Sequence, residues 1–443
     1  MKKFIALLLC ILIVFSLTAC GNTAEPAQTE LGPEVVEKKD NSKYHGIVAD
    51  PKSWYEEYMA LPIANENMTT DELRQLCVDT FRLNMSIPWT PNMPITYTYT
   101  LLERQSEVAL PIGLAYSGLC YATGIKNATM GNIWKMLPYW DPETGVLDVE
   151  AMGDSALNCI SSACAAGAQQ GWNRISATCG IVGMESYSMY ESNIVPVGDY
   201  KYEPHTYNYN FVSRTASNEI IAANGDEVMY ESYTKMLPAD GVFSSSSWHV
   251  MMIAQAPVVV RTSDGKVDPY QSYVLVHEQG AGGTKTDNYN YTQSNGKTMR
   301  PLGTIDNKYT FEALLSKGYI PFTLKEFIGE EKVVAGKAWL GSETTPLENG
   351  ADMTANSIFS QNLHTNFNLC NVKVEVKSPD GTVLVSYYPQ ILTGQRNTSH
   401  SLLGHLYKDR VEPYANGKNT IHIYARLTNG EEIEAFHTLL KMS

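Results

Sequence analysis

The sequence predicts an α+β fold, in which a helix-plus-antiparallel-sheet domain is followed by a small all-β sandwich domain. Apolar residues recur at helical spacing from Asp50 to about Leu83. Two strand-like runs, Trp248 to Val260 and Gln271 to Gln279, flank turn residues and indicate a hairpin. From Ala351 onward, short strands alternate with Asp-Gly and Asn-Gly turns, a pattern typical of a sandwich.

Size and charge limit the possible partners. The chain has 443 residues, enough for two or three domains of about 100 to 200 residues each. Its formal net charge is -14, and removal of a leader that carries Lys2 and Lys3 makes the remainder more acidic. Nucleic-acid binding needs a basic surface, so we expect no nucleic-acid partner.

The N-terminus has the features of an export signal. Lys2 and Lys3 precede an apolar run that is short for a membrane span, and the run ends in Leu17-Thr18-Ala19-Cys20-Gly21. This ending resembles a bacterial lipobox, which implies cleavage before Cys20 and lipidation of its sulfur. We therefore expect a signal peptide over 1–19, lipidated Cys20 with a flexible tether over 20–49, and attachment to the outer face of the cell membrane. The alternative is an ordinary signal peptide with a chance cysteine.

A possible nucleophile lies in the run from Met152 to Ser176. Cys159 stands where turn-like sequence gives way to small helix-forming residues, and a helix N-terminus lowers the pKa of a thiol. Packing in the core, or a disulfide with Cys164, is the alternative role for Cys159. The folded part contains six cysteines, whose even number permits disulfides and whose spacing does not indicate a metal site. They are Cys77, Cys120, Cys159, Cys164, Cys179 and Cys370.

A thiol amidase also needs an imidazole and a polar group that orients it. His249 begins the first strand of the predicted hairpin, and a turn near Asp264-Gly265 places position 280 opposite it. This register brings Glu278 and His277 within reach. Glu278 can stabilise an imidazolium ion. His277 faces the other side of the strand and is the second choice.

The order cysteine, histidine, polar residue resembles that of papain-like cysteine amidases of the NlpC and CHAP type. The similarity extends over roughly 110–280 and rests on short motifs. Tyr116 to Tyr121 resembles the family loop Y-x-G-x-P-Y, Asn158 to Ala163 its nucleophile motif, and Pro238 to Val242 its P-G-D-x-V turn. Trp248-His249-Val250 is similar to G-H-V, and Val274 to Gln279 to a V-x-V-x-E-Q ending. Asn158, Ile160 and Ala239 depart from the family pattern.

The resemblance implies a helical region over 50–100, a papain-like domain over 101–333 and a β-sandwich domain over 334–443. It implies that Cys159 attacks an amide carbonyl while His249, oriented by Glu278, transfers the proton, with no cofactor and no metal. Tyr121 and Trp248 would line the substrate groove, or else belong to the core.

These inferences predict a cell-surface lipoprotein that hydrolyses amide bonds, with peptidoglycan stem peptides as the expected substrate. One alternative is a catalytically inactive papain-like domain that binds cell-wall peptide or glycan. Another is a solute-binding or scaffolding lipoprotein, in which Cys159 and His249 would lie apart.

Overall fold

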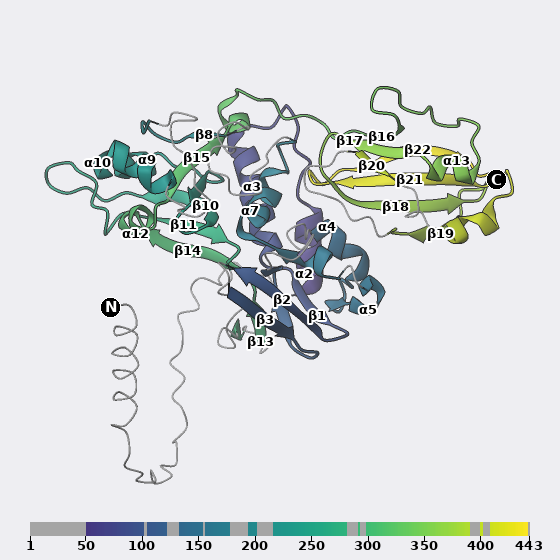
Figure 1. Cartoon of the computed structure of the whole chain (residues 1–443), viewed down its shortest axis with the longest axis horizontal. Helices are drawn as coiled ribbons and strands as arrows, with labels where there is room; N and C mark the ends of the chain where they lie inside the picture. Colours follow the sequence, from purple (N-terminus) through teal and green to yellow (C-terminus); the bar gives the residue numbers. More distant parts are fainter. Residues whose placement is uncertain are drawn as a thin grey trace, which may run out of the picture. The chain divides into compact units, whose positions relative to one another are not determined.

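A computed structural model describes most of the chain from Asp50 onward (Figure 1). The described ranges are 50–101, 104–121, 133–153, 156–177, 194–201, 216–280, 291–292, 298–389, 399–401 and 408–441. The predicted signal peptide, Cys20 and the tether lie outside them, as does Cys179. Among the described residues, no helix combines the length and the apolar character that crossing a bilayer requires.

Helical structure over 50–83 is confirmed, but the predicted helical region over 50–100 also contains strands β1 (Pro88–Pro91) and β2 (Ile95–Leu101) in its last part. The prolines there cannot continue a helix. Helix α2 covers Pro51–Met59, and α3 covers Thr70–Asn84. At the start of α3 the side chain of Thr69 accepts from the N–H of Glu72, and the Glu72 carboxylate accepts from the N–H of Thr69, so the two residues cap the helix reciprocally. Its apolar stripe is buried, so α3 supplies a packing surface for the rest of the domain.

The central sheet has six strands in the order β14-β11-β10-β9-β15-β8, and all neighbouring strands in it are antiparallel. Helices α3 and α7 (Cys164–Trp172) lie side by side, and both contact β10 and β11 (Figure 1). The strands are β8 (Ile194–Pro196), β9 (Gly241–Ser244), β10 (His249–Val258), β11 (Tyr273–Glu278), β14 (Thr304–Thr310) and β15 (Ile320–Leu324).

The predicted hairpin is confirmed in its strands and in its register. Met252 pairs with His277 and Ile253 with Val276, and continuing this register places position 280 opposite His249. The register shifts between Ile253 and Val258, so β10 is bulged in this part.

The other elements of this part surround the sheet. A second sheet has the order β12-β13-β4-β1-β6, β2 pairs with β3, and β5 pairs with β7. The strands are β1 (Pro88–Pro91), β2 (Ile95–Leu101), β3 (Arg104–Leu110), β4 (Ala115–Ser117), β5 (Cys120–Tyr121), β6 (Val146–Leu147), β7 (Ser161–Ser162), β12 (Tyr291–Thr292) and β13 (Thr298–Pro301). The helices are α4 (Ile133–Met136), η3 (Leu137–Tyr139), α5 (Val149–Met152), α6 (Ala156–Ile160), α9 (Ala216–Asn224), α10 (Asp226–Thr234), α12 (Phe311–Ser316) and η5 (Lys325–Ile328).

The C-terminal part contains two antiparallel sheets, ordered β16-β17-β20 and β19-β18-β21-β22, as the strand pattern predicted. Residues from Leu340 to Leu440 form one hydrophobic cluster there. The strands are β16 (Ala338–Gly341), β17 (Asn362–Thr365), β18 (Leu369–Lys377), β19 (Val383–Tyr387), β20 (Ser399–Ser401), β21 (Thr420–Leu427) and β22 (Glu432–Leu439). The helices are α13 (Ala355–Phe359), α14 (Lys408–Val411) and η6 (Glu412–Tyr414).

A larger hydrophobic cluster spans Trp54 to Phe327 and also includes Cys370. The helices of 50–100 therefore share their core with the segment 101–333, which the sequence had treated as a separate region. The molecule is a mixed α+β protein with two apolar clusters, in agreement with the predicted class.

Candidate functional site

The helix expected to begin at Cys159 begins instead at Cys164. Cys159 lies in the short helix α6, which ends at Ile160. The chain then becomes extended, because Ser161 and Ser162 pair with Cys120 and Tyr121 of β5. A new helix follows, and the prediction that Cys159 occupies a helix N-terminus is therefore wrong.

Cys164 is the first residue of α7. Ala163 precedes it in extended conformation, with φ -111° and ψ 172°. The first N–H groups of a helix have no carbonyl four residues earlier, and the peptide dipoles make this end electropositive. Cys164 thus occupies the position that the sequence had assigned to Cys159.

Cys164, His249 and Glu278 form one connected group. The side chains of Cys164 and His249 are hydrogen-bonded. His249 Nε2 lies 2.7 Å from Glu278 Oε2, which leaves Nδ1 for the bond with the thiol. The Cys164 Sγ also lies 3.7 Å from the carbonyl oxygen of Trp248. The structure therefore brings two of the three expected catalytic residues together, with a different cysteine.

The pKa of the Cys164 thiol differs in direction from those of the other described cysteines. Burial disfavours its thiolate, but the hydrogen bond and charge of His249, with hydrogen bonds from the N–H groups of Val250 and Ala165, hold its pKa below the ordinary value. Burial raises the pKa of Cys159 to about 11, a shift that nearby Lys135 only partly opposes. Among the cysteines in the described ranges, Cys164 is the one whose pKa is lowered. Those with raised pKa values are Cys77, Cys120, Cys159 and Cys370.

Imidazole and carboxylate stabilise one another in their charged forms. Burial opposes both charges, yet the hydrogen bonds that the His249 ring donates to Cys164 and Glu278 hold the pKa of His249 above its ordinary value. Burial likewise opposes ionisation of Glu278, and the bonds from His249, Asn307 and Tyr309 hold its pKa below the ordinary value. These contacts favour the charged forms of all three groups, a thiolate beside an imidazolium and a carboxylate.

Strand β14 supplies partners that the sequence did not reveal. The amide of Asn307 donates to Glu278 Oε1, and the hydroxyl of Tyr309 lies 3.3 Å from Glu278 Oε2. The ring of Tyr319 packs edge-on to His249 at a centroid distance of 6.5 Å. These contacts fix the carboxylate, but they depend on β11 pairing with β14, which no local pattern specified.

His277, the second choice for the third residue, takes no part in this group. Its Nδ1 accepts from the N–H of Asp306 at 3.2 Å, and its ring packs against Phe81 of α3. It lies on the other face of β11, as strand alternation predicted. Of the two residues, Glu278 is therefore the one that contacts His249.

The two residues considered for the substrate groove have different surroundings. Tyr121 is buried, and its carbonyl accepts from the hydroxyl of Tyr97, so it belongs to the core. Trp248 is half-buried, has φ 53°, and contributes its carbonyl to the environment of Cys164. Tyr121 is therefore a core residue, which was the alternative to lining the substrate groove.

The five cysteines in the described ranges are free thiols, and all are buried. They are Cys77, Cys120, Cys159, Cys164 and Cys370. A disulfide between Cys159 and Cys164 is therefore absent. Strand β7 separates the two residues, so they do not share one helix.

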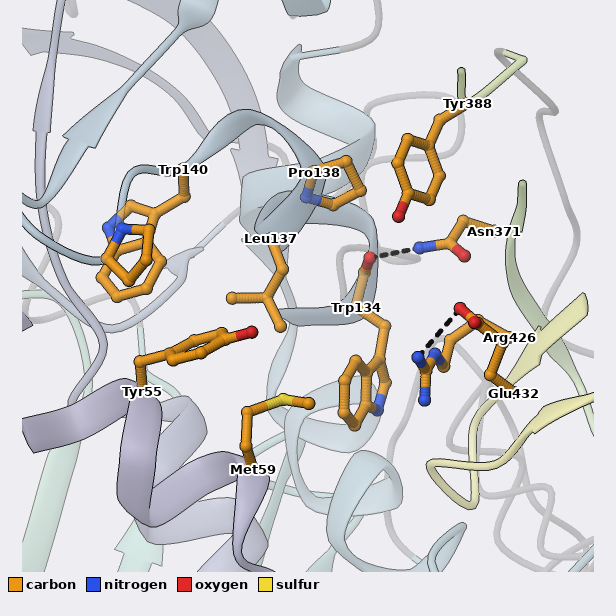
Figure 2. A pocket seen from close by; sticks show the side chains of 11 residues that line it. Tyr55, Met59, Trp134, Leu137, Pro138, Trp140, Asn371, Tyr388, Arg426 and Glu432 are labelled. Atoms are coloured by element: carbon orange, nitrogen blue, oxygen red, sulfur yellow. Dashed lines mark hydrogen bonds and ion pairs between the residues drawn. The ribbon is translucent and has the colours of Figure 1, made fainter. Parts of the chain in front are cut away.

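A pocket of about 180 Å³ is lined by residues other than Cys164, His249 and Glu278 (Figure 2). The hydroxyls of Tyr55 and Tyr388 point toward its interior (Figure 2). On one side the guanidinium of Arg426 lies 4.5 Å above the Trp134 ring and pairs with Glu432 at 2.9 Å. The lining residues are Tyr55, Met59, Trp134, Leu137, Pro138, Trp140, Pro142, Asn371, Tyr388, Arg426 and Glu432.

No family model, no curated protein and no solved structure matches this chain.

Proposed function

We propose that this chain is a cell-surface cysteine hydrolase with a papain-like domain of the NlpC and CHAP type, followed by a β-sandwich domain. The substrate we infer is an amide bond in peptidoglycan stem peptides. The observation that carries this proposal is the hydrogen-bonded row of Cys164, His249 and Glu278 at the N-terminus of α7. The nucleophile is Cys164, in place of Cys159.

Backbone conformation supports the resemblance at two of its motifs. Gly118 has φ 84°, and a Cβ there would lie 2.6 Å from the carbonyl oxygen of Met85, so the loop requires glycine. Ala239 has φ 66° at the position where the family turn has glycine. The Gln279 amide donates to the Leu119 carbonyl at 2.8 Å, linking the strand ending to the loop.

The chemistry follows from this arrangement. The Cys164 thiolate attacks the amide carbon, and N–H groups of the first turn of α7 stabilise the oxyanion. The His249 imidazolium donates its proton to the leaving amine, which leaves a thioester on Cys164. His249 then takes a proton from water, whose oxygen attacks the thioester and releases the acid. Glu278 holds the ring and stabilises its positive charge through both steps.

Digestion of purified wall sacculi tests this proposal. Wild type should release peptides with new amino and carboxyl termini, and Cys164→Ala should release none. Cys159→Ala is the matched control and should retain activity. Equal peptide release by wild type and Cys164→Ala would exclude the proposed nucleophile.

A lipid anchor at Cys20 would hold the hydrolase beside the wall. The basic residues, the apolar run and the Leu17-to-Gly21 sequence support this part of the proposal. Growth with a labelled fatty acid should label the wild-type protein and leave Cys20→Ala unlabelled. Labelling of both proteins would exclude anchoring through Cys20.

The aromatic pocket favours a second candidate function, binding of wall glycan. Its aromatic residues and the Tyr55 and Tyr388 hydroxyls match the apolar faces and hydroxyl groups of a sugar. Calorimetry with soluble wall glycan should show binding by Cys164→Ala, and addition of Tyr388→Ala should weaken it about tenfold, a loss of about 1.4 kcal/mol. Binding that does not change on loss of Tyr388 would exclude this pocket.

A further inference from the structure

The strands β21 and β22 carry two histidines and a glutamate on one face of the C-terminal sheet. His422 and His437 are direct cross-strand partners. The carboxylate of Glu434 contacts both rings, with Oε1 2.5 Å from His422 Nδ1 and Oε2 3.0 Å from His437 Nδ1. One nitrogen from each ring and one carboxylate oxygen all lie within 4.8 Å of one another.

A break in strand alternation creates this grouping. Glu434 and His437 are three residues apart, so a regular strand would place them on opposite faces. The register shifts here, because Ile423 pairs with Phe436 but Tyr424 pairs with Glu434, and Ala435 is the extra residue. This bulge brings Glu434 to the face that carries His422 and His437.

The rings are also held in place by groups outside the cluster. His422 Nε2 lies 2.9 Å from the hydroxyl of Thr420, an interaction that fixes the ring and leaves Nδ1 directed at Glu434. The two imidazoles stack at a centroid distance of 5.5 Å. Such partners on the second ring nitrogen commonly orient the histidine ligands of metal ions.

We propose that His422, Glu434 and His437 bind a divalent transition-metal ion of the Zn²⁺ class. Two imidazole nitrogens and one carboxylate oxygen are a ligand set that Zn²⁺ uses, and about 3.3 Å between ligand atoms follows from its bond lengths and tetrahedral angle. Small side-chain rotations bring the three atoms to that spacing. The half-exposed rings leave the fourth position open to water.

The surrounding charges permit such an ion. Glu375 of β18 is the cross-strand partner of His422 on the other side. Its carboxylate is paired with Lys373 at 3.4 Å and with Lys377 at 3.1 Å. Lys373 also pairs with Glu432 at 2.9 Å. The two lysines and two carboxylates balance one another, so the ion would be neutralised mainly by Glu434. The site would join β21 to β22 and is separate in sequence from Cys164.

The test is calorimetric titration of the full chain with ZnCl₂, in a Cys164→Ala background so that the thiolate does not bind the metal. We expect one Zn²⁺ per chain, and an affinity lowered 10- to 100-fold or more by His437→Asn or Glu434→Gln. Asp352→Asn, which removes an exposed carboxylate elsewhere in the same domain, should leave binding unchanged.

A further readout separates metal ligation from a structural role. Co²⁺ should give the visible absorption of a tetrahedral site with wild type and lose it with His437→Asn, while circular dichroism shows both chains folded. No Zn²⁺ binding, or equal binding by folded wild type and His437→Asn, would overturn the proposal.

Discussion

At the scale of single residues, the difference between Cys164 and Cys159 shows how strongly position determines the chemistry of a thiol. Both are buried, but Cys164 has a helix N-terminus and the imidazole of His249 beside it, whereas Cys159 has Lys135 in an apolar environment. The pKa values of the two thiols consequently move in opposite directions. Reactivity toward a small alkylating reagent should follow this difference.

Alkylation of Cys164 by iodoacetamide should already be fast at pH 7 and should slow in acid, as the thiolate is protonated through its lowered pKa. In Glu278→Gln the carboxylate that raises the pKa of His249 is lost, so less imidazolium remains to stabilise the thiolate. The Cys164 pKa should rise, and in the pH range below it the rate should fall by up to about tenfold for each unit of that shift. Mass spectrometry of the labelled peptide measures this rate.

The control for this experiment is Glu143→Gln, which removes an exposed carboxylate paired with Lys52. It should leave the pH profile unchanged. A profile of Glu278→Gln that coincides with that of wild type would show that the carboxylate does not act on the thiol through His249.

His277 should make stability depend on pH in the acid range. Burial lowers its pKa to about 3, so the native state keeps the ring neutral. Below about pH 6.5 the unfolded chain binds a proton there and the native state does not. The free energy of unfolding therefore falls as the pH falls, by up to about 1.4 kcal/mol per unit from this group.

His277→Asn keeps an acceptor for the N–H of Asp306 but does not titrate. Its unfolding free energy, measured in urea between about pH 4 and pH 7, should show a shallower slope than wild type even if its absolute value is lower. Parallel curves would show that His277 does not titrate differently in the two states.

At the scale of elements, the close contact between α3 and α7 depends on glycine. A Cβ on Gly171 would lie 2.7 Å from the carbonyl oxygen of Cys77 and equally close to the terminal methyl of Met252. Alanine ordinarily stabilises a helix by about 1 kcal/mol relative to glycine. Here overpacking should reverse the sign, so we expect Gly171→Ala to lower the free energy of unfolding by about 1 to 3 kcal/mol.

Gly280→Ala is the matched control, because a Cβ there meets nothing within 4 Å. Thermal unfolding of both variants checks the prediction. A melting temperature of Gly171→Ala at or above that of wild type would mean that the two helices can separate at little cost.

The sequence predicted the elements that are determined by residues close together in the chain. The apolar spacing from Asp50 to about Leu83 predicted the helices α2 and α3. The turn at Asp264-Gly265 gave the register that places Glu278 near His249. The start of α7 could not be found in this way. It depends on β7 pairing with β5, some forty residues earlier in the chain, and two serines carry no such information.

The same difference between local and long-range determinants applies to Glu278 and its hydrogen-bond partners. Strand alternation separated Glu278 from His277 correctly, since that choice needs only the period of one strand. Asn307 and Tyr309 were missed because they reach Glu278 through a strand pairing that follows a long connection. The sequence did contain a signal for the helix that begins at Cys164. Gly167 and Gly171 lie on the face of this helix that packs closely against its neighbours.

At the scale of the whole described chain, the two apolar clusters are joined through a few specific contacts. Asn371 of β18 donates to the carbonyl of Trp134, and Arg426 of β21 covers the ring of that tryptophan. Arg174, which follows α7, is buried and donates to the carbonyl of Pro62. Its Nη1 would lie 2.3 Å from a Cβ on Gly430, in the turn between β21 and β22.

Two glycines in hairpin turns therefore allow a matched test of these contacts between the two apolar clusters. Gly430 and Gly381 have φ values of 95° and 86°, so alanine at either position suffers about 1 to 2 kcal/mol of left-handed strain. At Gly381 the methyl group meets nothing within 4 Å. At Gly430 it also collides with Arg174, which is buried and hydrogen-bonded and so cannot easily move.

We expect Gly430→Ala to lower the free energy of unfolding by about 1 to 3 kcal/mol more than Gly381→Ala does, because overpacking adds to the shared backbone strain. Since the collision lies between the two clusters, it should also reduce their coupling, so that calorimetry resolves two transitions in Gly430→Ala where wild type and Gly381→Ala show one. Equal destabilisation by the two substitutions would mean that Arg174 moves freely and that Gly430 serves only the turn. Two transitions in wild type itself would mean that the clusters unfold independently and that these contacts contribute little to coupling them.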